Sequence, residues 1–188
     1  MMMAIDTETR PKGHVIWLTG LSGAGKSTLS KYLHEHFSQV GVPSYQLDGD
    51  LLRRGINNDL GFTANDRAEN IRRVSHIAAY MADAGLVCIV SCISPFSKNR
   101  KFARQVCADM GVGFVEEVFV SAPLEVVERR DVKGLYKKAR SGVIKEFTGI
   151  SSPYEVPETP EMVVETDVFN AEKCVEQIVS FLESEKII

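Results

Sequence analysis

The sequence predicts an α/β protein, in which a five-stranded, mostly parallel sheet carries helices on both faces. Three observations indicate this fold class. Apolar runs of strand length alternate with amphipathic stretches, a glycine-rich loop joins the first such pair, and 188 residues suffice for one domain with a sizeable core. Alternation favours parallel pairing, because a parallel strand needs a crossover connection. We expect a disordered tail over residues 1–12 and a single domain over residues 13–188.

The first half of the domain is expected to form three strands and two helices. A continuous apolar run predicts a buried strand over residues 14–19, and the helical spacing of leucine and phenylalanine predicts a helix over 27–37. A short strand over 43–47 precedes an acidic turn. Apolar residues on one face predict a long helix over 66–84, ended by a glycine, before a second buried strand over 86–93.

The second half continues the alternation. A more polar amphipathic stretch predicts a helix over 97–110, and a strand is expected over 115–120. Pro123 suits the first turn of the next helix, because proline lacks the N–H that a first turn leaves unpaired. A last strand over 161–166 precedes a final helix, whose N-terminus Asn170 can cap.

The first strand runs directly into a complete phosphate loop of the form G-x-x-x-x-G-K-[ST]. Its residues are Gly20, Leu21, Ser22, Gly23, Ala24, Gly25, Lys26 and Ser27. The glycines let the backbone bring N–H groups close to phosphate oxygens, and the following helix offers the positive end of its dipole. Lys26 would reach the β- and γ-phosphates, and the Ser27 hydroxyl would ligate Mg²⁺. The strand–loop–helix setting favours this interpretation over an ordinary glycine-rich turn, so we expect a nucleoside triphosphate to bind.

Two carboxylates, Asp48 and Asp50, flank a glycine at the end of the second strand, where ligands bind in open α/β sheets. They would hold Mg²⁺-bound water and orient or deprotonate an acceptor hydroxyl, and an Asx-rich turn is the alternative. The Asn-Lys-x-Asp motif of GTPases does not occur. The buried strand over 86–93 lacks the acidic residue of motor ATPases. Among phosphate-loop proteins, a kinase is therefore favoured.

A basic segment over residues 131–160, rich in glycine and proline, interrupts the alternation. Long aperiodic segments inside compact domains are usually functional or disordered. We expect a mobile lid whose cations stabilise charge on a transferring phosphoryl group, and a solvated basic loop is the alternative.

Composition excludes several classes of partner and location. The net charge of −3 gives no reason to expect nucleic acid or a membrane surface as a partner. The longest apolar stretch, residues 85–93, is too short to span a bilayer, and the first residues do not form a secretory signal. The four cysteines lack metal-ligand spacing and are expected to be buried thiols of a cytoplasmic protein.

The chain resembles the adenylylsulfate kinase (APS kinase) family of P-loop kinases from Lys12 to about Leu182. The resemblance lies in motifs that follow the family's order: GLSGAGKST at 20–28, LDGD at 47–50 with Arg53, Asn57 and DLGF at 59–62, DR at 66–67, ENIRR at 69–73, ISPF at 93–96, DVKGLYKKAR at 131–140 and FTGI at 147–150. It implies a P-loop kinase fold and MgATP-dependent phosphorylation of the ribose 3′-hydroxyl of adenosine 5′-phosphosulfate (APS). The products would be 3′-phosphoadenosine 5′-phosphosulfate and ADP, in sulfate assimilation. It also implies a cytoplasmic enzyme that is often a homodimer.

The resemblance also implies which residues bind the substrates. ATP would bind residues 20–28, including Thr28, with Mg²⁺ on Ser27 and, through water, on Asp48. APS would contact a set drawn from across the chain: Asp50, Arg53, Phe62, Arg67, Asn70, Ile93, Ser94, Lys133, Phe147 and Thr148. Lys26, Asp48, Asp50 and Ser94 would be the catalytic residues.

The chemistry of these side chains agrees with such an acceptor. Phe62 and Phe147 would sandwich the adenine ring, and Arg53 and Arg67 would bind the phosphate and sulfate oxygens. Core packing and surface charge are the alternatives. Members of the family are described with a phosphoserine at the position of Ser94, but we expect a substrate contact rather than an obligatory nucleophile, since in-line transfer needs only positioning, Mg²⁺ and cations.

The sequence departs from the family's pattern at Leu51, Ser97 and Glu146. These changes bear on substrate affinity and on the lid more than on the reaction. Two other functions stay open at this point: a small-molecule kinase with another acceptor, and a regulatory nucleotide-binding domain without transfer activity.

Overall fold

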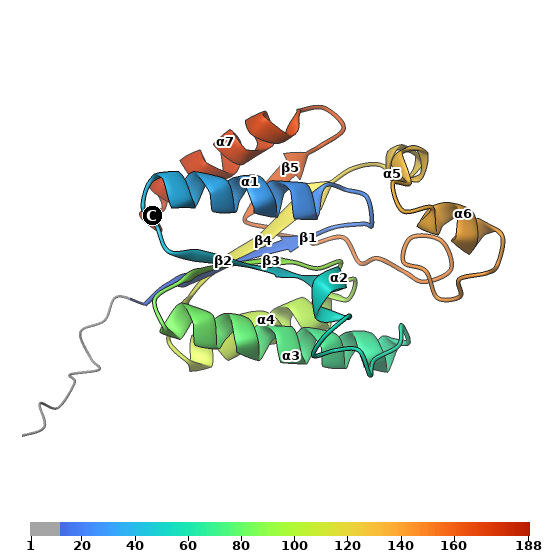
Figure 1. Ribbon diagram of the computed structural model, residues 1–188, viewed down its shortest axis with the longest axis horizontal. Helices are drawn as coiled ribbons and strands as arrows, with labels where there is room; N and C mark the ends of the chain where they lie inside the picture. The colour runs from blue at the N-terminus through green and yellow to red at the C-terminus, as the bar shows by residue number, and fades with distance from the viewer. Residues whose placement is uncertain (1–11) are drawn as a thin grey trace, which may run out of the picture.

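Five parallel strands form one sheet in the computed structural model, which describes residues 12–188 apart from the side chains of residues 115 and 116 (Figure 1). The strands are β1 His14–Thr19, β2 Ser44–Asp48, β3 Val87–Ser91, β4 Gly113–Ser121 and β5 Met162–Glu165. Their order is β2-β3-β1-β4-β5, and all four pairings are parallel. The predicted fold class is confirmed. The predicted disordered tail lies outside the described residues except for Lys12, which donates to the Met110 carbonyl at 2.7 Å.

Helices cover both faces of the sheet, as expected. They are α1 Lys26–Gln39, α2 Gly49–Leu52, α3 Ala64–Asp83, α4 Ser97–Asp109, α5 Leu124–Arg130, α6 Leu135–Arg140 and α7 Ala171–Ser184. Figure 1 shows α1 and α7 on one face and α3 and α4 on the other. The short helices α2 and α6 were not predicted, because four and six residues show no helical periodicity. Within the described residues, no helix combines the length and apolar composition that a membrane span requires.

The central strand β1 divides the hydrophobic core into two parts. Ile16 and Leu18 face the cluster under α1 and α7, whereas Val15 and Trp17 face the cluster under α3 and α4. All four side chains are fully buried. Because alternate residues of a strand point to opposite faces, burial on both faces explains why the strand is apolar throughout.

Helix α3 begins two residues earlier than predicted because of a capping box. The Thr63 hydroxyl accepts a hydrogen bond from the Asp66 amide at 3.2 Å, and the Asp66 carboxylate accepts one from the Thr63 amide at 3.2 Å. This reciprocal pairing satisfies two backbone donors at the helix start. It also fixes the direction in which the preceding loop enters α3.

The topology brings two loops together at the carboxyl ends of the strands. Strands β1 and β2 both pair with β3, so the phosphate loop after β1 and the acidic turn after β2 lie one strand apart. In the sheet register, Ser91 of β3 is opposite both Leu18 and Asp48. Ligands bind at this edge in open parallel sheets, and the candidate site is there.

The segment over residues 131–160, predicted as one lid, consists of two differently held parts. The first part contains α6, which lies at the end of the molecule away from the strands' starts (Figure 1). The second part is hydrogen-bonded to residues at the carboxyl ends of β1 and β3. Tyr154 pairs its hydroxyl with Thr19 Oγ1 at 2.9 Å, and the Glu155 amide donates to the Pro95 carbonyl at 2.8 Å. These long-range contacts had no local signal in the sequence.

Candidate functional site

A cavity of about 290 Å³ opens at the carboxyl ends of β1, β2 and β3. The phosphate loop, the acidic turn, the start of α3 and the start of α6 form its walls. It brings together these predicted site residues: Ser22, Gly23, Gly25, Lys26, Ser27, Thr28, Asp48, Asp50, Arg53, Phe62, Arg67, Asn70, Ile93, Ser94 and Lys133. Residues separated by more than a hundred positions in the chain therefore share one site.

The phosphate loop has a backbone conformation that glycine alone adopts easily. At Gly20 φ is +149°, and a Cβ there would lie 2.4 Å from the Val120 carbonyl oxygen. At Gly25, the residue before α1, φ is +105°, and no side chain caps the helix. The first N–H groups of α1 therefore face the cavity without a side-chain acceptor, which suits an anion.

Lys26 is buried beneath this loop with 8% of its surface exposed. Its ammonium donates to the carbonyls of Gly20 at 2.9 Å and Leu21 at 2.7 Å. Burial lowers the pKa of Lys26 to about 8, although the carboxylates of Asp50 and Asp48 act in the opposite direction. Phosphate oxygens would replace two neutral acceptors by charged ones. Gly20 and Leu21 themselves do not line the cavity.

Asp48 accepts four hydrogen bonds at the end of β2, beside the start of α1. One carboxylate oxygen accepts from the hydroxyls of Ser27 at 2.6 Å and Ser91 at 3.1 Å, and the other accepts from the amides of Asp50 at 2.9 Å and Leu51 at 3.2 Å. Burial acts to raise the pKa of Asp48, but these four donors outweigh it, and the pKa is lowered. A hydroxyl beside an ionised carboxylate supplies the oxygen ligands that Mg²⁺ prefers, so the residues present fit this ion.

Arg130 and Thr166 lie far from the phosphate loop in the sequence, but they hold its backbone in the folded chain. Neither residue was predicted from the sequence. Arg130 donates to the Gly23 carbonyl at 3.3 Å and to the Thr166 carbonyl at 2.6 Å. The Thr166 hydroxyl donates to the Ala24 carbonyl at 2.8 Å, so Ala24 supports the loop without lining the cavity. Neither residue belongs to a motif. Their role follows from the position of α5 and the end of β5 beside the loop.

The opposite wall carries Phe62 beside two guanidinium groups. Its ring is 53% exposed and lies 4.5 Å from Arg53 Cζ and 5.6 Å from Arg67 Cζ. Arg53 donates to the Gly61 carbonyl at 2.8 Å, and Arg67 donates to the Phe62 carbonyl at 2.9 Å and the Glu146 carbonyl at 2.8 Å. Since an arginine has five N–H donors, both can still bind an anion while they hold this backbone.

Phe147 and Thr148, which were predicted to contact the acceptor, do not line the cavity. Phe147 is 9% exposed and packs edge-on against Tyr136, with ring centroids 4.9 Å apart. Thr148 is 2% exposed, and its hydroxyl is buried without a hydrogen-bond partner. In this conformation the two residues belong to the core beneath α6, and their contact with a ligand stays a prediction.

The start of α6 and the residues before it form one wall of the cavity and contact the acidic turn. Asp131 accepts from the amides of Tyr136 and Lys137, both at 3.0 Å, which fixes the start of the helix. Lys133 forms an ion pair with Asp50 across the mouth of the cavity. Ser91 and Tyr136 are among the cavity residues that were not predicted. Ser91 was hidden in an apolar run, although its place at a strand's carboxyl end was a usable signal.

Ser94 is buried, 2% exposed, and has a φ of 41°, which is unusual for a residue with a side chain. Its hydroxyl accepts from Trp17 Nε1 at 3.1 Å and donates to Thr19 Oγ1 at 3.0 Å. Its carbonyl accepts from Arg100 at 2.9 Å. The hydroxyl also lies 3.3 Å from the Cys92 carbonyl, and none of these three partners is a side-chain base, so the geometry provides no activation of Ser94 as a nucleophile.

A phosphate loop on a doubly covered parallel sheet, facing a second wall of cations and one exposed aromatic ring, defines a P-loop kinase. The chain belongs to the adenylylsulfate kinase family. The family model described as "Adenylylsulphate kinase" matches residues 12–165.

Comparison with individual proteins supports the same family. The chain is 52% identical over 179 residues to an adenylyl-sulfate kinase of Clostridium acetobutylicum, covering 95% of this chain and 88% of the relative. It superposes with a TM-score of 0.89 on an APS kinase of Mycobacterium tuberculosis in complex with AMPPNP and APS, at 46% identity, covering 92% and 99% of the two chains. It also resembles a hexameric APS kinase of Thiobacillus denitrificans, with 30% identity and a TM-score of 0.72, covering 95% of this chain and 30% of that one.

Proposed function

We propose that this protein is an adenylylsulfate kinase, which transfers the γ-phosphoryl group of MgATP to the ribose 3′-hydroxyl of APS. The observation that carries the proposal is the pairing of two unlike walls in one cavity. One wall has the phosphate loop with Lys26, and the other presents the exposed ring of Phe62 beside Arg53 and Arg67. A neutral sugar carries no negative charge for the two guanidinium groups to bind.

The donor half would bind ATP by its phosphates. Lys26 would exchange its two carbonyl acceptors for the β- and γ-phosphates, beside the free N–H groups at the start of α1. Ser27 would ligate Mg²⁺, and Asp48 would hold it through water. When bound, Mg²⁺ neutralises charge on the phosphate oxygens and so favours departure of ADP.

The acceptor half would orient APS for in-line attack. Phe62 would stack on the adenine ring, and Arg53, Arg67 and the Asn70 amide would bind the phosphosulfate. Asp50 would accept the proton of the 3′-hydroxyl as the oxygen–phosphorus bond forms and the β,γ-bridging bond of ATP breaks. Ile93 and Ser94 would contact the same ligand from the end of β3.

The lid is proposed to be the part of the 131–160 segment that contains α6. In the structure Lys133 pairs with Asp50, and substrate phosphates would compete for its ammonium group. Phe147 and Thr148 lie in the same segment after α6 and would reach the acceptor after α6 moves. Tyr154, in contrast, is hydrogen-bonded to Thr19 at the carboxyl end of β1 and would not move with the lid.

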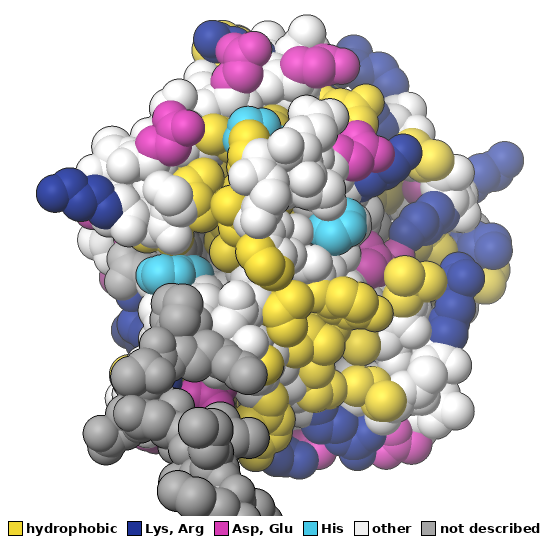
Figure 2. Space-filling view, turned by 60° about the vertical axis from the view of Figure 1, so that its left-hand side comes forward, with side chains coloured by type: hydrophobic (Ala, Val, Ile, Leu, Met, Phe, Trp, Pro, Cys, Tyr) yellow, Lys and Arg dark blue, Asp and Glu magenta, His cyan; other side chains and the backbone are white. Residues whose placement is uncertain are grey.

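We further propose a cytoplasmic homodimer. The four cysteines are free and buried, the form favoured in reducing compartments. Figure 2 shows hydrophobic side chains gathered on a face away from the phosphate loop, and such patches often mark interaction sites. Val40, Tyr45 and Tyr80 are among the large exposed hydrophobic residues. Light scattering after size-exclusion chromatography should give twice the 20.8 kDa chain mass, and a monomer or hexamer would contradict this.

A coupled ADP-release assay tests the reaction against its two alternatives. APS together with MgATP should release ADP, and each reagent alone should not. A sugar that replaced APS as acceptor would favour the other kinase, and no release with any acceptor would favour a regulatory domain. Lys26→Ala is the control, because loss of one preorganised charge typically costs about 3 kcal/mol or more in the barrier. Circular dichroism should match the parent protein.

A further inference from the structure

The loop over residues 53–62, here called the acceptor loop, presents Arg53 and Phe62 to the cavity. It joins α2 to α3 and consists of turns, with backbone bonds such as the one from the Asn57 amide to the Leu52 carbonyl at 3.0 Å. The Phe62 ring is more exposed than buried, so hydrophobic packing does not fix it. Its position therefore depends on what holds the loop's backbone.

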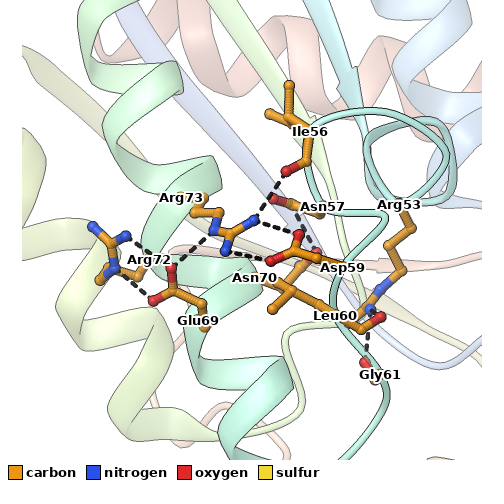
Figure 3. A network of polar contacts seen from close by, with 10 residues as sticks. All are labelled: Arg53, Ile56, Asn57, Asp59, Leu60, Gly61, Glu69, Asn70, Arg72 and Arg73. Atoms are coloured by element: carbon orange, nitrogen blue, oxygen red, sulfur yellow. Dashed lines mark hydrogen bonds and ion pairs between the residues drawn. The ribbon is translucent and has the colours of Figure 1, made fainter.

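Arg73 of α3 makes the most extensive contact with this loop from outside the cavity (Figure 3). It donates to both carboxylate oxygens of Asp59, at 2.7 and 2.8 Å, and to the Ile56 carbonyl at 2.9 Å. Its Nε donates to Glu69 at 2.8 Å, one turn earlier on α3. Arg73 thus joins the acceptor loop to a rigid helix in the planar, two-bond geometry that lysine cannot provide.

The carboxylates of Glu69 and Asp59, which accept these hydrogen bonds, are ionised at neutral pH. Hydrogen bonds from Arg72 and then Arg73 lower the pKa of Glu69 to about 2, and the hydrogen bond from Arg73 lowers the pKa of Asp59. Exposed ion pairs usually contribute little, but a two-bond arginine pair inside a network is an exception to that rule. Here the pair holds the loop from outside the cavity, where it adds to the loop's own backbone turns.

Buried hydrogen bonds connect the acceptor loop to residues that line the cavity. Asn57 is fully buried and donates to the side-chain oxygen of Asn70 at 3.0 Å, and Asn70 lines the cavity. Beyond Asp59, the carbonyls of Gly61 and Phe62 are held from the cavity side by arginines. The acceptor loop is therefore clamped between Arg73 on its outer side and the site on its inner side.

We propose that the Arg73–Asp59 pair is a positioning device for the acceptor half of the site. Arg73 does not line the cavity, yet it sets the place of Phe62 and Arg53. This inference rests on the proposed function, because its readout is the binding of APS. Loss of the pair should weaken APS binding and leave the phosphate loop, and hence ATP, nearly unaffected.

The neighbouring residue Arg72 provides a matched control. It lies on the same helix and donates at 2.6 and 2.8 Å to Glu69, so it contacts α3 and not the loop. Arg73→Met and Asp59→Asn should raise the KM for APS about tenfold, since small displacements of positioning groups have effects of this size. The KM for ATP should stay within about twofold of the parent value, and Arg72→Met should leave both constants unchanged.

Hydrogen exchange of peptides over residues 54–62 gives a second readout that does not depend on turnover. Exchange should quicken in Arg73→Met and Asp59→Asn but not in Arg72→Met. If Arg73→Met folds poorly, Asp59→Asn decides, because it changes an exposed loop residue.

Three results separate the possible failures. No APS-dependent ADP release by the parent protein refutes the proposed function. An active parent with unchanged KM for APS in both pair variants overturns the positioning role alone. An equal rise in both KM values also overturns it, since that would indicate general destabilisation.

Discussion

The Tyr136 hydroxyl donates a hydrogen bond to the Ser22 carbonyl at 2.8 Å, which fastens α6 to the phosphate loop. The two residues are 114 positions apart in the chain. The bond therefore links the donor-binding loop to the helix whose start lines the cavity.

Tyr136→Phe should loosen this link while it keeps the ring packed on Phe147. A hydrogen bond of this kind contributes about 1 kcal/mol, so the KM for ATP should rise about fivefold. Exchange of amides in α6 should quicken. Unchanged exchange in α6 would show that the bond does not restrain the helix.

Nucleotide binding should take up protons near pH 8 through Lys26. Burial lowers its pKa to about 8 in the free site, and bound phosphates would raise it. At pH 8 the free site is about half protonated and the bound site fully protonated, so ADP binding should take up about half a proton. At pH 6 Lys26 is already charged in both states, so its contribution to the uptake should vanish.

Calorimetric titration with ADP in buffers of different ionisation enthalpy measures this uptake. Lys26→Arg, which keeps its charge at both pH values, should abolish it. A heat at pH 8 that does not depend on the buffer would contradict the predicted role of Lys26.

The two phenylalanines should respond differently to truncation, because one is 53% exposed and the other 9%. Phe62→Ala should weaken APS binding by about 1–3 kcal/mol with little effect on unfolding. Phe147→Ala should lower the free energy of unfolding by about 3–5 kcal/mol, since it leaves a cavity against Tyr136. Isothermal titration and thermal melting of each variant measure these quantities. Equal stability losses at both positions would place Phe62 in the core as well.

Ser94→Ala should retain APS-dependent turnover. Its hydroxyl contacts Trp17 and Thr19 rather than a base, so transfer does not need it as an intermediate. A moderate rise in the KM for APS is expected from the lost contact. Complete loss of turnover in a variant that melts like the parent would instead support a covalent phosphoserine.

Local sequence patterns were enough to predict the donor half of the site. The phosphate loop and the Asp48–Asp50 turn each lie within a few residues, and their function depends on local backbone geometry. The strands could be found because full burial of β1 and β3 makes their sequences apolar throughout. The five-stranded sheet followed from the alternation of the elements.

The acceptor half depends on contacts that no local pattern encodes. Arg67 was expected to bind an anion, and it also holds the Phe62 and Glu146 carbonyls, which lie 5 and 79 residues away. Backbone carbonyls are present at every residue, so the sequence does not indicate which of them an arginine will contact. Phe147 could not be separated from Phe62 by residue type, because burial against Tyr136 is a property of the folded chain.

The contact between Thr166 and Ala24 joins residues 142 positions apart. During synthesis the phosphate loop leaves the ribosome early, long before its last support exists. Until β5 pairs with β4 and Thr166 reaches the loop, a nascent chain has the complete nucleotide motif without the bond that holds Ala24. The set of contacts that supports the phosphate loop is therefore completed only late in translation, when the edge strand joins the sheet.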